Sequence, residues 1–282
     1  LRRCRIIFIR YLFLERDMSK PIQAPVPDRL PDLKEMTQAR VSLGRHGSGL
    51  PTSAQLAFLL DHARAREAVW TKVDNSALRQ RLEAAGLSSV SVNSMAGDRS
   101  IYVRRPDLGR MLSPQDHARL QAISRAERFD LVVVVADGLS SSAVELNAVP
   151  LIETLGPRFA ELGLSVAPIV LASQARVALG DPVGEALGVK ISLVLVGERP
   201  GLSAADSLGA YITFDPKPGT PDSRRNCVSN IRDGGLVIQD GARIIAALIR
   251  DMLKTGISGV SLNAAVGQLD APRSEAGILS QE

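Results

Sequence analysis

The stretch that decides the fold is KISLVLVGERPGLSAADSLGAYITFDPKPGTPDSRRNCVSNI, residues 190–231. Its aliphatic run at 191–196 is too short to span a membrane and too apolar for a surface strand. The run therefore predicts a strand covered on both faces. It ends in the turn Gly197-Glu198-Arg199-Pro200-Gly201, which presents a Glu and an Arg where the strand emerges. In open α/β sheets, ligands bind at this carboxyl-terminal edge.

Alternating strand and helix patterns surround this stretch. Strands are predicted at 131–135, 165–171, 191–196 and 210–214, and helices at 114–126, from Ser141, from Asp181 and at 240–254. Such alternation is typical of a parallel sheet with right-handed crossovers. We expect an α/β domain over residues 111–263, Rossmann-like, with a mostly parallel sheet and helices on both faces.

A smaller, mainly helical region with short strands is expected before it, over residues 39–110. Its first helix is predicted to begin near Thr52 or Ser53. Apolar residues spaced i, i+3, i+4 and i+7 are expected to form its buried face: Leu56, Leu59, Leu60 and Ala63. Polar residues off that stripe are expected to face solvent or another subunit: Asp61, His62, Arg64, Arg66 and Glu67.

Three further segments are predicted in the same region. A second helix covers 76–85 and closes at Gly86, a common C-cap residue. The strand-like segments 89–92 and 101–103 are expected to pair with each other.

Both ends of the chain are expected to lie outside the folded core. Residues 1–38 contain a proline-rich part, and residues 264–282 are predicted to form a loose tail. The basic leader favours upstream translated sequence, with the protein starting at Met18, over a signal peptide or a membrane-surface helix.

Charge and composition limit the possible partners. Residues 1–20 carry six Lys and Arg against two Asp and Glu, a net charge of +4 that equals the surplus of the whole chain. The remainder is neutral and the aromatic fraction is only 4%, so no nucleic-acid partner is expected. The two cysteines, Cys4 and Cys227, imply no disulfide framework and suit a reducing cytoplasm. No apolar run approaches about 18 residues, so no membrane span is expected.

No pattern for an independent catalytic centre is present in the sequence. The three histidines, His46, His62 and His117, lack partners at metal-ligand spacing, and no phosphate-binding fingerprint occurs. Cys227 follows two arginines and could be a reactive thiol. Because no base accompanies it, a buried or ligand-contacting cysteine is the preferred interpretation.

Loops at strand ends offer binding groups instead. Asp137 and Ser140 flank a strand-to-helix turn, where free N–H groups can hold polar ligand atoms. Capping of the following helix explains both residues equally well. For Glu198, the alternative to ligand binding is an ion pair with an arginine of the same chain.

Five separate segments, in this order, resemble the small (light) subunit of ethanolamine ammonia-lyase. They are ARVSLGRHGSGLPT at 39–52, LDHARAREAV at 60–69, VVADGLS at 134–140, GERPGLSAADSLGAY at 197–211 and RNCVSNI at 225–231. The resemblance covers residues 33–263. It implies a subunit of an adenosylcobalamin-dependent enzyme that converts ethanolamine to acetaldehyde and ammonia.

The resemblance also implies where the cofactor binds. In this family the cofactor lies between the small subunit and a large, barrel-shaped subunit. Matching motifs carry the small-subunit contacts onto Val177 in Ala175-Arg176-Val177, and onto Glu198 and Cys227 in the last two segments quoted above. Substrate-binding residues belong to the large subunit, so no catalytic residue is expected here. The chain is expected to be inactive alone, in a hetero-oligomer in the cytoplasm, inside or beside a bacterial microcompartment.

Two other functions remain compatible with the sequence. One is a stand-alone α/β enzyme with a nucleotide cofactor, which the missing phosphate fingerprint disfavours. The other is a non-catalytic microcompartment adaptor, which normal activity after removal of residues 190–231 would favour.

Overall fold

The computed structural model describes Leu33, Thr37 and residues 39–270. Most of the predicted leader, 1–38, and the tail after 270 lie outside the described residues. The chain divides into two compact units, residues 1–44 and residues 45–282, and the elements below belong to the second. Within the described residues, no helix is both long and apolar enough to cross a membrane.

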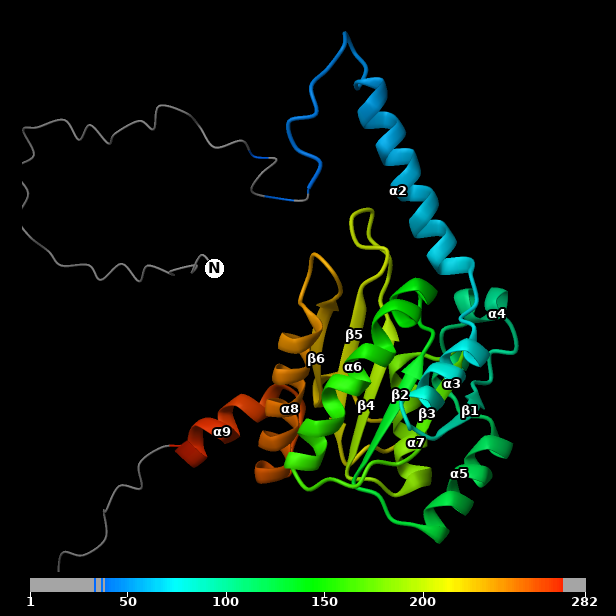
Figure 1. Cartoon of the computed structure of the whole chain (residues 1–282), viewed down its shortest axis with the longest axis vertical. Helices are drawn as coiled ribbons and strands as arrows, with labels where there is room; N and C mark the ends of the chain where they lie inside the picture. Colours follow the sequence, from blue (N-terminus) through cyan, green and yellow to red (C-terminus); the bar gives the residue numbers. More distant parts are fainter. Residues whose placement is uncertain (1–32, 34–36, 38, 271–282) are drawn as a thin grey trace, which may run out of the picture. The chain divides into compact units, whose positions relative to one another are not determined.

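A six-stranded sheet forms the centre of the second unit (Figure 1), in the order β1-β3-β2-β4-β5-β6. Along the chain the strands are β1 Ser89–Asn93, β2 Leu131–Ala136, β3 Ile169–Ser173, β4 Ile191–Gly197, β5 Leu208–Phe214 and β6 Arg225–Ile231. The pairs from β1 to β4 are parallel, whereas β5 is antiparallel to both β4 and β6. The expected α/β fold with a mostly parallel sheet is confirmed.

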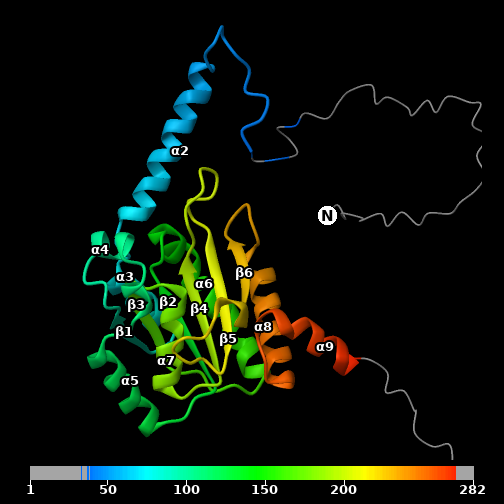
Figure 2. The ribbon, with the colours of Figure 1, turned by 180° about the vertical axis from the view of Figure 1, so that it is seen from behind.

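Helices cover both faces of the sheet, as expected. One face packs on α3 (Asn75–Ala84), α6 (Ser141–Glu161) and α8 (Ile238–Thr255), and the other on α5 (Pro114–Ala126) and α7 (Gly180–Leu187) (Figures 1 and 2). Neighbouring strand residues point to opposite faces, so Val133 belongs to the first core and Val132 to the second. This two-sided burial explains why the central strands are continuous apolar runs.

The remaining elements are short, apart from one long helix. They are α2 Thr52–Trp70, α4 Arg99–Arg104, α9 Leu262–Asp270 and short 3-10 helices at Leu108–Arg110, Val177–Leu179, Asp222–Arg224 and Gly259–Ser261. Residues 264–270, expected to be part of a loose tail, continue α9.

Two predictions for residues 89–103 need correction. The segment 101–103 is not a strand but part of α4, whose first turn is capped by Asp98 accepting the N–H of Ile101. β1 therefore pairs in parallel with β3 at the edge of the sheet, and not with 101–103.

The helix α2 forms where predicted, but its apolar stripe is not buried. Leu56, Leu59 and Leu60 are between 51 and 61% exposed, and Ala68 is the one buried residue among those of α2. The expected buried face is therefore wrong. The spacing of these four residues did not identify a buried side, and spacing carries no information on whether the same chain covers one side of a helix.

The buried arginine Arg225 fastens the edge strand β6 to the start of α7. Its guanidinium donates to both carboxylate oxygens of Asp181, at 2.6 and 2.7 Å, and also to the Thr220 carbonyl and the Thr213 hydroxyl. Both charged side chains are at most 3% exposed. This bidentate pair holds the first residue of β6 in place.

Truncating one leucine in the core and one on α2 separates buried from exposed apolar positions. Leu151→Ala, at a fully buried site in α6, is expected to lower the free energy of unfolding by about 2–5 kcal/mol. Leu59→Ala is expected to change it by less than about 0.5 kcal/mol. Urea unfolding followed by circular dichroism measures both, and equal losses would contradict the described exposure of α2.

Replacing Arg225 with Met leaves the Asp181 carboxylate buried without its partner. The expected loss is about 3–5 kcal/mol of unfolding free energy, whereas the exposed neighbour Arg224→Met costs less than about 0.5 kcal/mol. Burial raises the pKa of Asp181, so protonation at low pH removes the buried charge. The loss of unfolding free energy in the Arg225→Met variant should therefore become smaller as the pH falls. A loss that grows on acidification would contradict this account.

Candidate functional site

The candidate site lies where the strands β3 and β4 end. Because these strands are parallel, the segment after β3, residues 174–177, and the turn after β4, at Glu198, leave the sheet at the same edge. β5 begins at that edge, where the Glu198 N–H donates to the Ser207 carbonyl at 3.0 Å. The location agrees with the expectation for an open α/β sheet.

Two adjoining cavities bring the predicted residues together. The first, about 330 Å³, is lined by Val177 and Cys227, and the second, about 390 Å³, by Val177 and Glu198. Both cavities share Val177, Arg176 and Tyr211. Val177, Glu198 and Cys227, which come from three separate segments, therefore line one continuous surface.

The position of Val177 depends on Tyr102, a fully buried side chain of α4. The Tyr102 hydroxyl donates to the Ala175 carbonyl at 3.1 Å, and the Arg176 guanidinium lies 4.3 Å from the centre of its ring. Arg99 contacts the same ring at 4.8 Å. A cation against an aromatic ring is attractive, so these contacts fix the loop that carries Val177.

In the turn after β2, the side chains of Asp137 and Ser140 form hydrogen bonds within the chain. Both carboxylate oxygens of Asp137 accept backbone N–H groups, from Gln174 at 2.9 Å and Ala175 at 2.8 Å, with Arg99 at 3.5 Å. Burial raises the pKa of Asp137, and these donors and Arg99 oppose that effect. Ser140 caps α6 by accepting the N–H of Ala143. The capping interpretation is therefore confirmed for Ser140 and wrong for Asp137, which holds the loop after β3 instead.

Cys227 lies opposite Tyr211 in the β5–β6 ladder and is exposed. The surrounding protein raises the pKa of its thiol, the Tyr211 hydroxyl opposes this through a hydrogen bond, and the Glu198 carboxylate adds to the rise. The thiol is therefore neutral at pH 7, which excludes an activated thiolate. Burial also raises the pKa of Tyr211, so thiol and phenol present a neutral surface together.

Glu198 is held by hydroxyl groups. Its carboxylate accepts hydrogen bonds from the side chains of Ser207 and Ser229, at 2.5 and 2.6 Å, and from the Asn230 N–H at 3.2 Å. Within residues 39–270, the ion pairs of the structure do not include Glu198 with an arginine. The alternative, an ion pair with an arginine, is therefore not formed among the described residues.

Sequence reasoning missed several residues of this surface. Tyr102, Arg110, Arg176 and Tyr211 support or line the cavities. Tyr211 stood at the end of a segment quoted for the resemblance, and Arg176 directly precedes Val177. Only the fold shows that Tyr102 contacts the loop that carries Val177 and that Tyr211 lines the same cavities as this loop.

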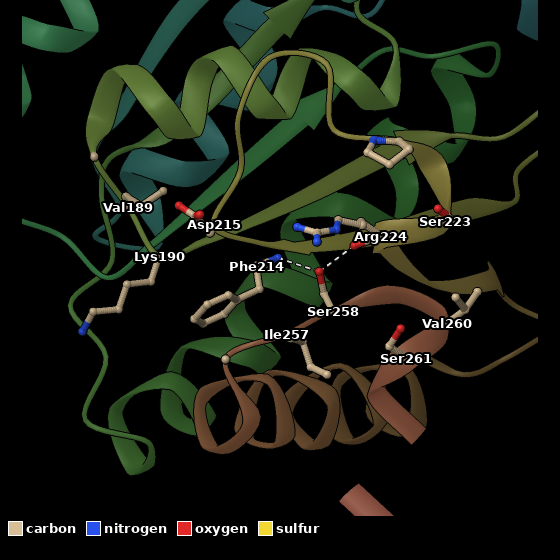
Figure 3. Close-up of a pocket in the computed structure, with 13 residues that line it drawn as sticks. Val189, Lys190, Phe214, Asp215, Ser223, Arg224, Ile257, Ser258, Val260 and Ser261 are labelled. Carbon is tan, nitrogen blue, oxygen red and sulfur yellow. Dashed lines mark hydrogen bonds between the residues drawn. The ribbon is translucent and has the colours of Figure 1, made fainter. Parts of the chain in front are cut away.

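Another cavity, of about 500 Å³, lies at the opposite end of β4, beside Lys190 (Figure 3). The seven residues of β4 lie between Lys190 and Glu198, which places these two residues roughly 26 Å apart at 3.3 Å per residue. Its Ser258 accepts the Phe214 N–H at 3.0 Å and donates to the Arg224 carbonyl at 2.5 Å, so this hydroxyl joins β5 to the segment before β6. The cavity contains none of the predicted site residues.

A metal site is not formed by protein side chains in the described part of the chain. No group of three or more His, Cys, Asp or Glu residues there is placed to hold an ion. The two cavities around Val177 are lined by apolar side chains and by charged ones, among them Arg110, Arg176 and Arg225.

Comparison with known proteins shows the family of this chain. Residues 27–263 match the family model described as "Ethanolamine ammonia-lyase light chain (EutC)". A protein of Rhodopseudomonas palustris named ethanolamine ammonia-lyase small subunit is 48% identical over 245 residues, covering 87% of this chain and 93% of the relative.

Relatives of the same name from other bacteria are nearly as similar. The protein of Azotobacter vinelandii is 45% identical and covers 87% of this chain and 92% of its own length. That of Pseudomonas fluorescens Pf0-1 is 44% identical, with 92 and 95% coverage. The chain belongs to the ethanolamine ammonia-lyase light chain family.

Proposed function

We propose that this chain is the small subunit of an adenosylcobalamin-dependent ethanolamine ammonia-lyase and forms one wall of its cobalamin site. The large subunit forms the other wall. The observation that carries the proposal is the convergence of Val177, Glu198 and Cys227 on two adjoining cavities. Membership of the light chain family supports the assignment to this enzyme.

The residues of this surface fit a corrinoid. Cobalamin is large, with an apolar ring surrounded by neutral amides, and needs acceptors and apolar contacts spread over a broad surface. Val177 offers an apolar contact, Glu198 a hydrogen-bond acceptor, and Cys227 with Tyr211 a neutral polar contact. No histidine of the described residues lines either cavity, so these residues would contact the periphery of the cofactor and supply no ligand to the cobalt.

The cofactor and this chain have different roles in the proposed reaction. When bound, the cofactor supplies the radical chemistry through its cobalt–carbon bond. This chain binds and orients it, and the neutral thiol of Cys227 offers no competing nucleophile. Substrate binding and catalysis are assigned to the large subunit.

A partner is required because one wall does not enclose the cofactor. Both cavities are open, so water is excluded only after a second protein covers them. We therefore propose a hetero-oligomer with the large subunit, inactive when this chain is alone. Its proposed location is the cytoplasm, with association to a bacterial microcompartment.

Reconstitution with the large subunit tests the proposal. Ammonia release from ethanolamine is expected only when both chains and adenosylcobalamin are present, and the purified complex should bind cyanocobalamin, seen as a shift in its visible absorbance. Combining Val177→Ala, Glu198→Gln and Cys227→Ala should weaken cyanocobalamin binding at least about tenfold, or 1.4 kcal/mol.

The matched control is Ser261→Ala in the cavity beside Lys190, and it should leave affinity unchanged. Full activity of the large subunit alone would overturn the proposal. So would a folded triple variant that binds cyanocobalamin as tightly as the parent complex.

The neutral thiol of Cys227 gives an independent test. Because its pKa is raised, alkylation by iodoacetamide at pH 7.5 should be slower than that of free cysteine, whose pKa is about 8.5, and should accelerate only at higher pH. Cyanocobalamin bound to the two-chain complex should slow it further. Mass mapping of the Cys227 peptide measures the rate, and fast alkylation at pH 7.5 or a lack of protection would contradict the assignment.

A further inference from the structure

Glu198 occupies a site built by three segments. The Ser207 hydroxyl, just before β5, donates to Oε2 at 2.5 Å, and the Ser229 hydroxyl, near the end of β6, donates to Oε1 at 2.6 Å. The Asn230 N–H adds a third bond to Oε2 at 3.2 Å. Short O–H···O⁻ bonds of this kind are among the stronger hydrogen bonds in proteins. Three donors, one just before β5 and two on β6, therefore fix the orientation of one carboxylate.

The backbone leaves space for this arrangement. A Cβ atom at Gly209 would lie 2.8 Å from Oε1 and 3.0 Å from Cγ of Glu198. Any larger residue at 209 would displace the carboxylate from β5. Glycine at position 209 therefore provides the space that the Glu198 carboxylate occupies.

Counting acceptor positions shows which oxygen can bind a further donor. A carboxylate has about four lone-pair positions, two on each oxygen. Oε2 already accepts two hydrogen bonds, from Ser207 and Asn230, whereas Oε1 accepts one, from Ser229. Among the residues that the structure describes, one acceptor position on Oε1 is therefore left without a donor.

We propose that Ser207 and Ser229 are positioning residues for the cofactor contact of Glu198, and that the remaining position on Oε1 accepts one amide N–H of the corrinoid. This inference rests on the proposed function, because it concerns the same surface. The serines act through the carboxylate: they hold it against β5 with one acceptor position directed to the ligand, so that binding does not have to order a free side chain.

The test measures cyanocobalamin affinity by visible absorbance in the two-chain complex. Ser207→Ala and Ser229→Ala should each weaken binding about three- to tenfold, because each removes a charge-assisted hydrogen bond that orders Glu198. Ser229→Thr keeps the hydroxyl and should restore affinity. Ser261→Ala, exposed and lining the cavity beside Lys190, is the matched control and should have no effect.

A double-mutant cycle distinguishes positioning from general structure. In a Glu198→Ala background, Ser229→Ala should have no further effect on affinity, because the residue through which it acts is gone. Additive losses would overturn the positioning role. Ser229 is exposed, so its variant should fold even if the variant of buried Ser207 does not.

Two failures are distinguishable. If Glu198→Ala leaves cyanocobalamin affinity unchanged, the contact in the proposed function is wrong. If Glu198→Ala weakens binding but neither serine variant does, the contact stands and the positioning role is overturned.

Discussion

The close contact between the turns after β2 and β4 determines where the candidate site is formed. Leu139 donates its N–H to the Gly197 carbonyl at 2.8 Å. A Cβ atom at Gly138, whose φ is +57°, would lie 2.2 Å from that carbonyl oxygen, and one at Gly197 would lie 2.1 Å from the Ser140 carbonyl oxygen. Only glycine permits this approach. Both strands therefore end together, and Glu198 emerges beside the loop that carries Val177.

The change from parallel to antiparallel pairing then completes the site. Because β5 runs against β4 and β6 against β5, the start of β5 and the end of β6 reach the edge where β4 ends. Ser207 and Ser229 thus meet Glu198, while Cys227 lies opposite Tyr211 on the sheet. A fully parallel sheet would have needed helical crossovers there and would have placed fewer polar groups around one carboxylate.

Sequence patterns predicted the central strands of the fold well, because strands that are buried on both faces appear in the sequence as nearly uninterrupted apolar runs. The runs at 131–136 and 191–197 are continuous and apolar for that reason. β6 escaped prediction because it is an edge strand whose partner β5 carries an irregularity between Leu208 and Ala210, so its buried residues do not alternate regularly. The three-residue run at 101–103 was too short to separate strand from helix, and the capping Asp98 was the better signal.

The site was predictable only in part for a related reason. Segments shared with the family pointed to Val177, Glu198 and Cys227, but no spacing in the sequence brings three distant segments to one surface. The supporting residue Tyr102 and the serines around Glu198 carry no local motif, since their role depends on tertiary contacts. The exposed stripe of α2 shows the same limit, because periodicity does not reveal what covers a face.

The most direct measurement is a crystal or cryo-electron microscopy structure of the two-chain complex with bound cyanocobalamin. The account predicts one corrinoid in contact with Val177 and Cys227, with an amide nitrogen about 2.7–3.2 Å from Glu198 Oε1. A corrinoid held entirely by the large subunit, with this edge of the sheet turned away from it, would contradict the account.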